Sequence, residues 1–335
     1  MPGLSGMRAC FAGAESSRPP ENGLMERFIQ ILARVGLFVA GFVVVRLIVQ
    51  GVGHLAVDAA TPLDYRISGR MNPDTYFPVL DEWFRAVSDY TNILIGTAGL
   101  SWLAAWGLYA LFPGAQRIWA GLLALEGIIF AGLALAGKLF PNSTLLGANA
   151  LEVVAFLALF GFLAWHYARC DRAAMRRWGV TAALMALCGI SANQFIIEPV
   201  KKDVARPRPF NDAHKPWNET LRRIPDEYLR GANSYPSGHT GGTFALLTPL
   251  FLQLRRRRER TLVAGWAVMQ GLSRIYTAAH FFFDVLIGAF LGIAVGALGH
   301  YLLGGESVRP RDPKPTPQQS HETSPLQETP DMPMK

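Results

Sequence analysis

The stretch VLIGAFLGIAVGALGHYLL, residues 285–303, contains no Asp, Glu, Lys or Arg and a single histidine, His300. A helix of this length and apolarity is typical of a segment that crosses the hydrocarbon core of a bilayer. Comparable stretches recur towards the amino terminus, and they predict an all-α fold, a polytopic transmembrane bundle of about eight membrane helices. The candidate helices are Val35–Val57, Ile93–Leu111, Ile118–Lys138, Ala148–Tyr167, Gly179–Ile197, Thr240–Leu254, Leu262–Tyr276 and Val285–Leu303.

The composition agrees with a membrane protein. Of the 335 residues, 50% are hydrophobic and 17% are charged, whereas about 25% are charged in soluble domains. The net charge of +7 would suit a nucleic-acid binder, but the basic residues lie between apolar stretches rather than on a polar surface. We therefore expect no nucleic-acid partner. The three cysteines show no metal-site spacing, and we expect neither a disulfide nor a metal centre.

Two short basic loops set the expected orientation, because Lys and Arg accumulate on the cytoplasmic side of a membrane. Residues 169–178 carry four arginines and one aspartate, and residues 255–260 carry five arginines and one glutamate. Both loops fall on one side of an eight-helix count, and the acidic loop 58–90 falls on the other. Both termini are then expected in the cytoplasm, and the segment 198–240 is expected outside.

These patterns divide the chain into four parts. Residues 1–27 are expected to form a disordered cytoplasmic terminus, and residues 28–117 to hold N-terminal membrane helices with an extracytoplasmic loop. Residues 118–303 form the expected membrane core. Residues 304–335 are polar and rich in proline, which is typical of a disordered tail.

Three polar clusters lie beside helix ends in the core. They are Lys201, Arg208 and Pro209 in KKDVARPRPF (201–210), the tetrapeptide PSGH (236–239), and the set Ser273, Arg274, His280 and Asp284. In the eight-helix topology all three clusters face the same membrane surface. We therefore expect them to meet in space.

Several of these residue types suit a phosphate group. The guanidinium groups of Arg208 and Arg274 offer forked donors that match phosphate oxygens, and Lys201 adds a third positive charge. Ser237 and Gly238 precede a helix, and the first N–H groups of a helix, together with its dipole, favour a bound anion. These five residues are the candidate phosphate-binding set.

Two histidines and an aspartate are candidate catalytic groups. His280 and Asp284 are four positions apart, so on a helix they share one face and the carboxylate orients the imidazole. This pair suits a histidine nucleophile, with His239 as general acid for a departing oxygen. The aromatic residues 281–283 either pack against protein or lipid, or line the path of a substrate chain.

Together, the patterns K-x6-RP, PSGH and SR-x5-H-x3-D resemble the signature of the type 2 phosphatidic acid phosphatase superfamily. The resemblance is specific over residues 179–303, and every motif position is filled. It implies a six-helix core, so either the two helices before Ile118 are an addition or one of the early predicted spans is wrong. It also implies a reaction through a phosphohistidine without metal or cofactor. The roles that it implies are nucleophile for His280, orienting partner for Asp284, general acid for His239, and phosphate binding for Lys201, Arg208, Ser237, Gly238 and Arg274.

The expected function is an integral membrane lipid phosphatase, placed in a bacterial inner membrane with its active site on the extracytoplasmic face. It would remove the terminal phosphate of a lipid phosphate or diphosphate, such as undecaprenyl diphosphate, phosphatidate, phosphatidylglycerophosphate or a lipid A phosphate. Besides this substrate, the expected partners are membrane lipids. One alternative is a lipid phosphotransferase that uses the same phosphohistidine. Another is a non-catalytic lipid transporter or scaffold, but such a protein is expected to lose catalytic residues, and here none is missing.

Overall fold

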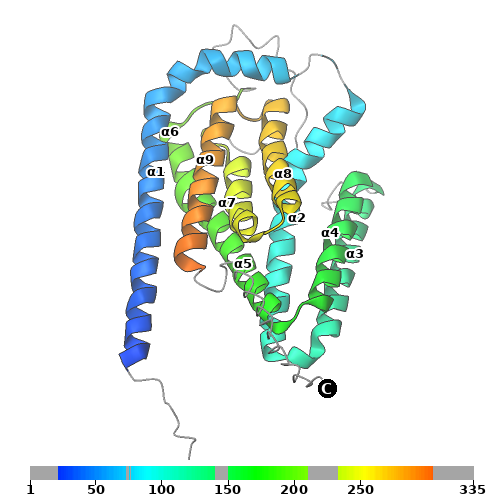
Figure 1. Ribbon diagram of the computed structural model, residues 1–335. Helices are drawn as coiled ribbons and strands as arrows, with labels where there is room; N and C mark the ends of the chain where they lie inside the picture. Colours follow the sequence, from blue (N-terminus) through cyan, green and yellow to red (C-terminus); the bar gives the residue numbers. More distant parts are fainter. Residues whose placement is uncertain (1–21, 73–74, 76, 140–149, 210–232, 305–335) are drawn as a thin grey trace, which may run out of the picture.

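The computed structural model describes residues 22–72, 75, 77–139, 150–209 and 233–304. Within these residues the fold is all-α, as the sequence predicts (Figure 1). Two π-helices, Ala192–Ile197 and Gly299–Leu303, continue α5 and α9. The α-helices are α1 (Asn22–Met71), α2 (Pro78–Leu111), α3 (Gln116–Leu139), α4 (Ala150–Arg169), α5 (Arg172–Ser191), α6 (Glu198–Val204), α7 (Gly238–Gln253), α8 (Arg257–Tyr276) and α9 (Phe282–Leu298).

Long apolar helices identify an integral membrane protein. Among the described residues, four stretches are long and apolar enough to cross a membrane, namely Met25–Met71, Gln116–Leu133, Arg172–Val204 and Phe282–Leu303. Large apolar side chains are exposed along α1, which a bilayer tolerates and water does not. The count of eight spans stays a prediction.

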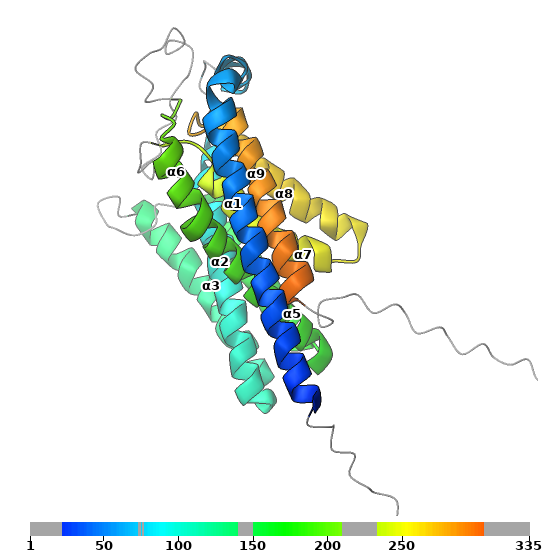
Figure 2. The same cartoon turned by 90° about the vertical axis from the view of Figure 1, so that its left-hand side faces the viewer.

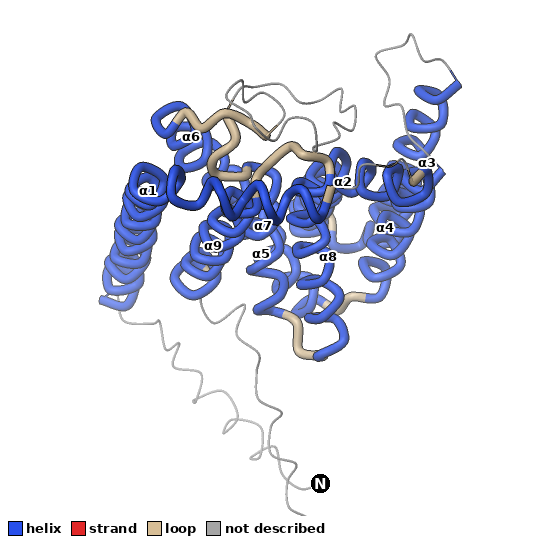
Figure 3. Tube along the Cα trace, turned by 90° about the horizontal axis from the view of Figure 1, so that it is seen from above, coloured by secondary structure: helices blue, strands red, loops and turns tan. Residues whose placement is uncertain are grey.

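The first helix is much longer than the sequence indicates. The predicted loop over residues 58–90 is wrong, because α1 continues to Met71 and α2 already begins at Pro78. Pro62 lies inside α1, and the last part of the helix bends and runs across one end of the bundle (Figures 1 and 3). A bend of this kind is the usual effect of an internal proline, which removes a helical hydrogen bond.

Most other predicted helices lie close to their observed bounds, and the differences concern their ends. The two basic loops are shorter than predicted, because α4 ends at Arg169 and α8 begins at Arg257. Residues 22–27, predicted as part of a disordered terminus, belong to α1. The rest of that terminus and the predicted tail beyond residue 304 lie outside the described residues.

Close contact between α7 and α9 forms the centre of the bundle. A methyl group on Gly288 would lie 2.7 Å from the carbonyl oxygen of Ser237, and one on Gly296 would lie 2.6 Å from Cβ of Thr248. Only glycine permits this approach, which is common between helices in membranes. On the outer side, α1 and α9 run side by side along the bundle (Figure 2).

Four helix ends gather at one end of the bundle. They are the carboxyl ends of α6 and α8 and the amino ends of α7 and α9, and the bent part of α1 crosses over them (Figures 1 and 3). The turns between α4 and α5 and between α7 and α8, which the arginines of the two basic loops flank, lie away from this end (Figure 1). The arrangement brings the three polar clusters to one end of the molecule.

Candidate active site

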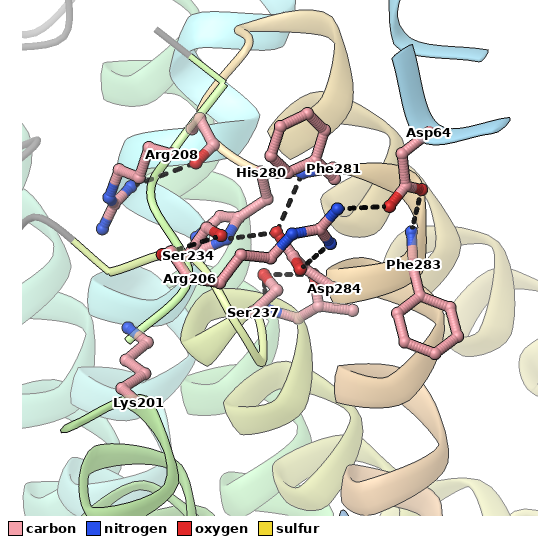
Figure 4. Close-up of polar contacts among 12 residues, drawn as sticks. Asp64, Lys201, Arg206, Arg208, Ser234, Ser237, His280, Phe281, Phe283 and Asp284 are labelled. Atoms are coloured by element: carbon pink, nitrogen blue, oxygen red, sulfur yellow. Dashed lines mark hydrogen bonds and ion pairs between the residues drawn. The ribbon is translucent and has the colours of Figure 1, made fainter. Parts of the chain in front are cut away.

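All three polar clusters meet where these helix ends gather. Figure 4 shows Lys201, Arg208, Ser237, His280 and Asp284 close to one another. The remaining predicted residues, Gly238, His239 and Arg274, belong to the same group, because Gly238 contacts Lys201 and the positive charge of Arg274 acts on both histidines. The structure therefore brings together every residue that the sequence predicts for the site.

The amino end of α7 forms the candidate phosphate seat. Ser237 caps the helix, with its Oγ accepting the N–H of Thr240 at 3.4 Å, and it is fully buried. Its own N–H donates to the carbonyl oxygen of Asp284 at 3.0 Å, which fixes the start of α7 against the first turn of α9. Since the first N–H groups of a helix have no partner within it, this end suits an anion.

Three cations surround this seat. The Nζ atom of Lys201 lies 3.3 Å from the position that a Cβ atom on Gly238 would take, and 3.6 Å from Oε1 of Glu198. Arg208 is buried, and its Nη1 donates to the carbonyl oxygen of Ala279 at 3.2 Å. Lys201 and Arg208 thus supply two of the three positive charges, and Arg274 supplies the third.

A tight turn after α8 joins the third cation to the candidate nucleophile. The carbonyl oxygen of Arg274 accepts the N–H groups of Ala279 and His280, each at 3.1 Å. Ala278 in this turn has φ of 56°, a left-handed conformation that costs free energy in a residue other than glycine. The guanidinium of Arg274 is buried and donates to the hydroxyl of Ser88 in α2.

His280 is buried beside Asp284 but not on the same helix. The predicted helical placing of the pair is wrong, because α9 begins only at Phe282 and His280 lies in the turn before it. The Nδ1 atom of His280 is 3.7 Å from Oδ2 of Asp284, which is too long for a hydrogen bond. The two side chains still face each other, because the turn folds back onto the first turn of α9.

The surroundings keep the imidazole of His280 neutral. Burial, followed by the positive charges of Arg208, Arg274 and Lys201, lowers the pKa of His280 well below its usual value of 6.5. Each of these causes penalises the protonated ring. A neutral imidazole has a lone pair on one ring nitrogen, which is the form that a histidine nucleophile needs.

A buried ion network that sequence analysis missed supports Asp284. Arg206 lies between two carboxylates, with Nη1 2.7 Å from Oδ1 of Asp284 and Nη2 2.8 Å from Oδ2 of Asp64 (Figure 4). All three side chains are at most 3% exposed. Because Asp64 belongs to the bent part of α1, the network ties the first helix to the catalytic cluster.

The same two carboxylates also hold the aromatic residues that follow His280. Asp284 Oδ2 accepts the N–H of Phe281 at 3.0 Å, and Asp64 Oδ1 accepts the N–H of Phe283 at 2.8 Å. The ring of Phe281 lies 4.1 Å from Cζ of Arg206, a cation–π contact. The ring of Phe283 stacks on Tyr235, with centroids 6.0 Å apart. These contacts support the packing alternative for Phe281 and Phe283 over a role beside a substrate chain.

Sequence gave a signal for only one of the missed residues. Arg206 lies inside KKDVARPRPF, where the pair Arg-Pro occurs twice. The repeated pair places a second arginine two residues from Arg208, and this proximity is the signal for Arg206. Asp64 and Ser88 fall in a stretch that the sequence predicts as an acidic loop. Their link to the site depends on the bend of α1 and the early start of α2, which no local pattern indicates.

Comparisons with known proteins find a family match and one curated relative. The PAP2 superfamily profile matches residues 182–306, which include all the predicted site residues. A lipid A 1-phosphatase of Porphyromonas gingivalis is 47% identical over 73 residues, 21% of this chain. The match spans only 16% of the length of that relative. The comparison with solved structures found no match.

Proposed function

Since residues 182–306 form a PAP2 superfamily domain, we propose that this protein is a lipid phosphatase that hydrolyses the terminal phosphate of a lipid phosphate or diphosphate. One observation supports the proposal above the others. Three cations and the amino end of α7 surround a buried histidine whose pKa is lowered. A phosphate group bound there would face a neutral nucleophile and several charged donors at once.

The proposed reaction has two steps. In the first, Nε2 of His280 attacks phosphorus, the N–P bond forms and the bond from phosphorus to the lipid oxygen breaks. His239, the second residue of α7, enters this step as the imidazolium, which the negative charge of the bound phosphate favours, and gives its proton to the departing oxygen. In the second step, water attacks the phosphohistidine, His239 takes a proton from that water, and the N–P bond breaks to release phosphate. Nδ1 of His280 faces Asp284, which supports Nε2 as the attacking atom.

The cations carry the electrostatic part of this mechanism. Phosphoryl transfer spreads negative charge over the three equatorial oxygens, and fixed positive groups stabilise it most where water is excluded. Arg208 and Arg274 are 5% and 1% exposed, so their charges act in a poorly solvated place. We propose that Lys201, Arg208 and Arg274 take the part that a divalent metal plays in other phosphatases.

The proposed setting is a bacterial inner membrane, with the site on the extracytoplasmic face and both termini in the cytoplasm. The arginines that flank the turn before α5 and the turn before α8 lie away from the end of the bundle that holds the site (Figure 1). Arginines beside short turns accumulate on the cytoplasmic side, and this supports the orientation. The similarity to a lipid A 1-phosphatase supports testing lipid A phosphates among the substrates.

Phosphate release tests the proposal directly. Purified protein is incubated, in the presence of a chelator, with phosphatidate, phosphatidylglycerophosphate, undecaprenyl diphosphate and lipid A. We expect release from at least one lipid, and a loss of about a thousandfold or more in His280→Ala. His54→Ala is the control and should retain full activity, because this exposed histidine of α1 bonds Asp203 on the outer side of α6 and contacts none of the candidate site residues. Equal rates for wild type and His280→Ala would overturn the assignment of the nucleophile.

A further inference from the structure

A cavity of about 330 Å³ lies between α2, α5 and α7. Ligand pockets for small molecules usually measure about 300–1,000 Å³, so this cavity is large enough for part of a lipid but not for a whole one. None of the candidate catalytic or phosphate-binding residues lines it. Its walls include Gly96, Gly99 and Leu100 from α2, Ile190 and Asn193 from α5 and the π-helix, and Leu246 from α7.

Two glycines of α2 keep this cavity open. A methyl group on Gly96 or on Gly99 would meet no atom within 4 Å. The glycines between α7 and α9 behave differently, because a methyl group on Gly288 would clash with Ser237. Gly96 and Gly99 therefore border free volume instead of permitting close helix contact.

Asn193 links the cavity to the candidate phosphate seat. Its Nδ2 lies 2.6 Å from the position that a Cβ atom on Gly242 would take, and Gly242 lines the cavity. Its Oδ1 lies 3.6 Å from the corresponding position on Gly238, in the phosphate seat. The cavity thus begins about one helical turn along α7 from the seat. Asn193 belongs to the π-helix Ala192–Ile197, and π-helices are frequent at functional sites.

The outer rim of the cavity faces the lipid. Leu100 and Ile190, which both line it, are 54% and 57% exposed. Ile190 lies within the apolar stretch Arg172–Val204, one of the candidate membrane spans. An apolar group could therefore enter from the bilayer without crossing water.

We propose that this cavity holds one hydrocarbon chain of the lipid substrate while its phosphate occupies the seat at the start of α7. The inference rests on the proposed function and adds where the hydrocarbon chain of the substrate binds. Lipid tails are as apolar as the cavity walls, so moving a chain from the bilayer gains little hydrophobic free energy. Selection between lipid substrates then depends on whether the volume and shape of the hydrocarbon chain fit the cavity. The lining residues from Met185 to Gln194 extend about 13 Å along the helix axis, which sets the depth available to a chain.

Filling the cavity tests the proposal. Gly99→Leu should place a side chain in free volume, and Gly107→Leu is the matched control on the same helix, since Gly107 also meets no atom within 4 Å but does not line the cavity. The substrates are dipalmitoyl phosphatidate and dibutyryl phosphatidate in the same mixed micelles. We expect Gly99→Leu to lower the ratio of kcat/KM for the long-chain over the short-chain substrate about tenfold. Gly107→Leu should leave it unchanged.

A ratio of kcat/KM values that is unchanged in Gly99→Leu would overturn the proposal, whether both substrates keep their rates or both lose equally. A second readout does not depend on turnover. A phosphatidate with a photoactivatable diazirine in its acyl chain should label peptides 96–100 or 185–194 in the wild type, and label them less in Gly99→Leu. Labelling confined to other helices would also overturn it. If the wild type hydrolyses neither phosphatidate, the proposed activity on this lipid fails, and the labelling alone decides on the cavity.

Discussion

Nη1 of Arg206 lies 2.7 Å from Oδ1 of Asp284, while Nη2 of the same guanidinium lies 2.8 Å from Oδ2 of Asp64. Arg206 therefore holds the candidate orienting carboxylate in place and connects it to α1. The first helix is thus not a mere addition to the membrane core, because its Asp64 belongs to the ion network that holds the candidate orienting residue Asp284. A positioning role for Arg206 follows, since both of its Nη atoms already donate to carboxylates.

Arg206→Met should lower kcat about a hundredfold and change KM much less. Asp284 would lose its partner and the geometry of His280 would loosen, and small misplacements of catalytic groups have effects of this size. Leaving buried carboxylates unpaired should also lower the free energy of unfolding by about 3–5 kcal/mol. Steady-state kinetics and thermal unfolding in detergent measure the two effects.

Arg66→Met is the matched control for this variant. It removes an exposed arginine from the same part of α1 and should change neither quantity. Arg206→Lys should recover part of kcat, because it keeps the charge but loses the fork that reaches both carboxylates. A raised KM with unchanged kcat in Arg206→Met would instead place Arg206 on the substrate phosphate.

Ser88→Ala should weaken the binding of phosphate without removing a catalytic group. The Ser88 hydroxyl accepts from the buried guanidinium of Arg274, and a hydrogen bond to a charged group contributes about 1.5–3 kcal/mol. We expect the inhibition constant of inorganic phosphate to rise at least about tenfold. Ser101→Ala, on the same helix but bonded to Glu126, is the control. Unchanged inhibition in Ser88→Ala would show that Arg274 is held in place without the Ser88 hydroxyl, for example by its bond to the backbone carbonyl of the same residue.

The site motifs could be predicted from sequence because each lies within a few residues of a helix end. Hydropathy indicates where a helix ends, and helices of alternating direction place every second end at the same surface, so Lys201, Ser237 and His280 were expected together. The position of Asp64 could not be predicted in this way. It depends on a helix that continues past Pro62 and bends over the bundle, whereas proline and acidic residues usually indicate a loop.

The placing of His280 shows a related limit. A spacing of four residues to Asp284 fits one helical face, yet the chain reaches a similar proximity through a turn stabilised by the carbonyl of Arg274. Spacing alone does not separate the two geometries. The left-handed Ala278 that completes the turn has no sequence signal either, since glycine or asparagine is the usual residue there.

The imidazole of His280 should stay neutral at pH values where an ordinary histidine is half protonated. Its pKa is lowered by burial and by three cations, so we expect its titration by ¹⁵N-histidine NMR well below pH 6.5. The signal is assigned by its absence in His280→Gln. A midpoint at 6.5 or above would contradict the burial and the charges seen around the ring.

The same shift predicts the direction of a change in stability. Below pH 6.5 the unfolded chain binds a proton at this histidine and the folded protein does not, so the free energy of unfolding should fall as the pH is lowered from 6.5 towards the depressed folded-state pKa. His280→Gln should show a smaller fall over the same range. Thermal unfolding of the two proteins at several pH values measures the difference, and identical pH dependence would argue against a neutral buried imidazole.

His239→Ala separates protonation of the leaving group from attack on phosphorus. His239 is the second residue of α7, next to the phosphate seat, where the negative charge of a bound phosphate would favour its protonated form. A poor leaving group such as a lipid alkoxide needs a proton as it departs, whereas nitrophenolate leaves without one. General acids contribute about 10²–10⁴-fold, so we expect a loss of this size on a lipid phosphate and a much smaller loss of burst-phase nitrophenol release from para-nitrophenyl phosphate.

Because water attack in the second step also needs His239, the phosphoenzyme should accumulate in the variant. If His239→Ala matched the wild type in burst rate and in turnover of both substrates, His239 would have no part in proton transfer. The test of His280 would be unaffected.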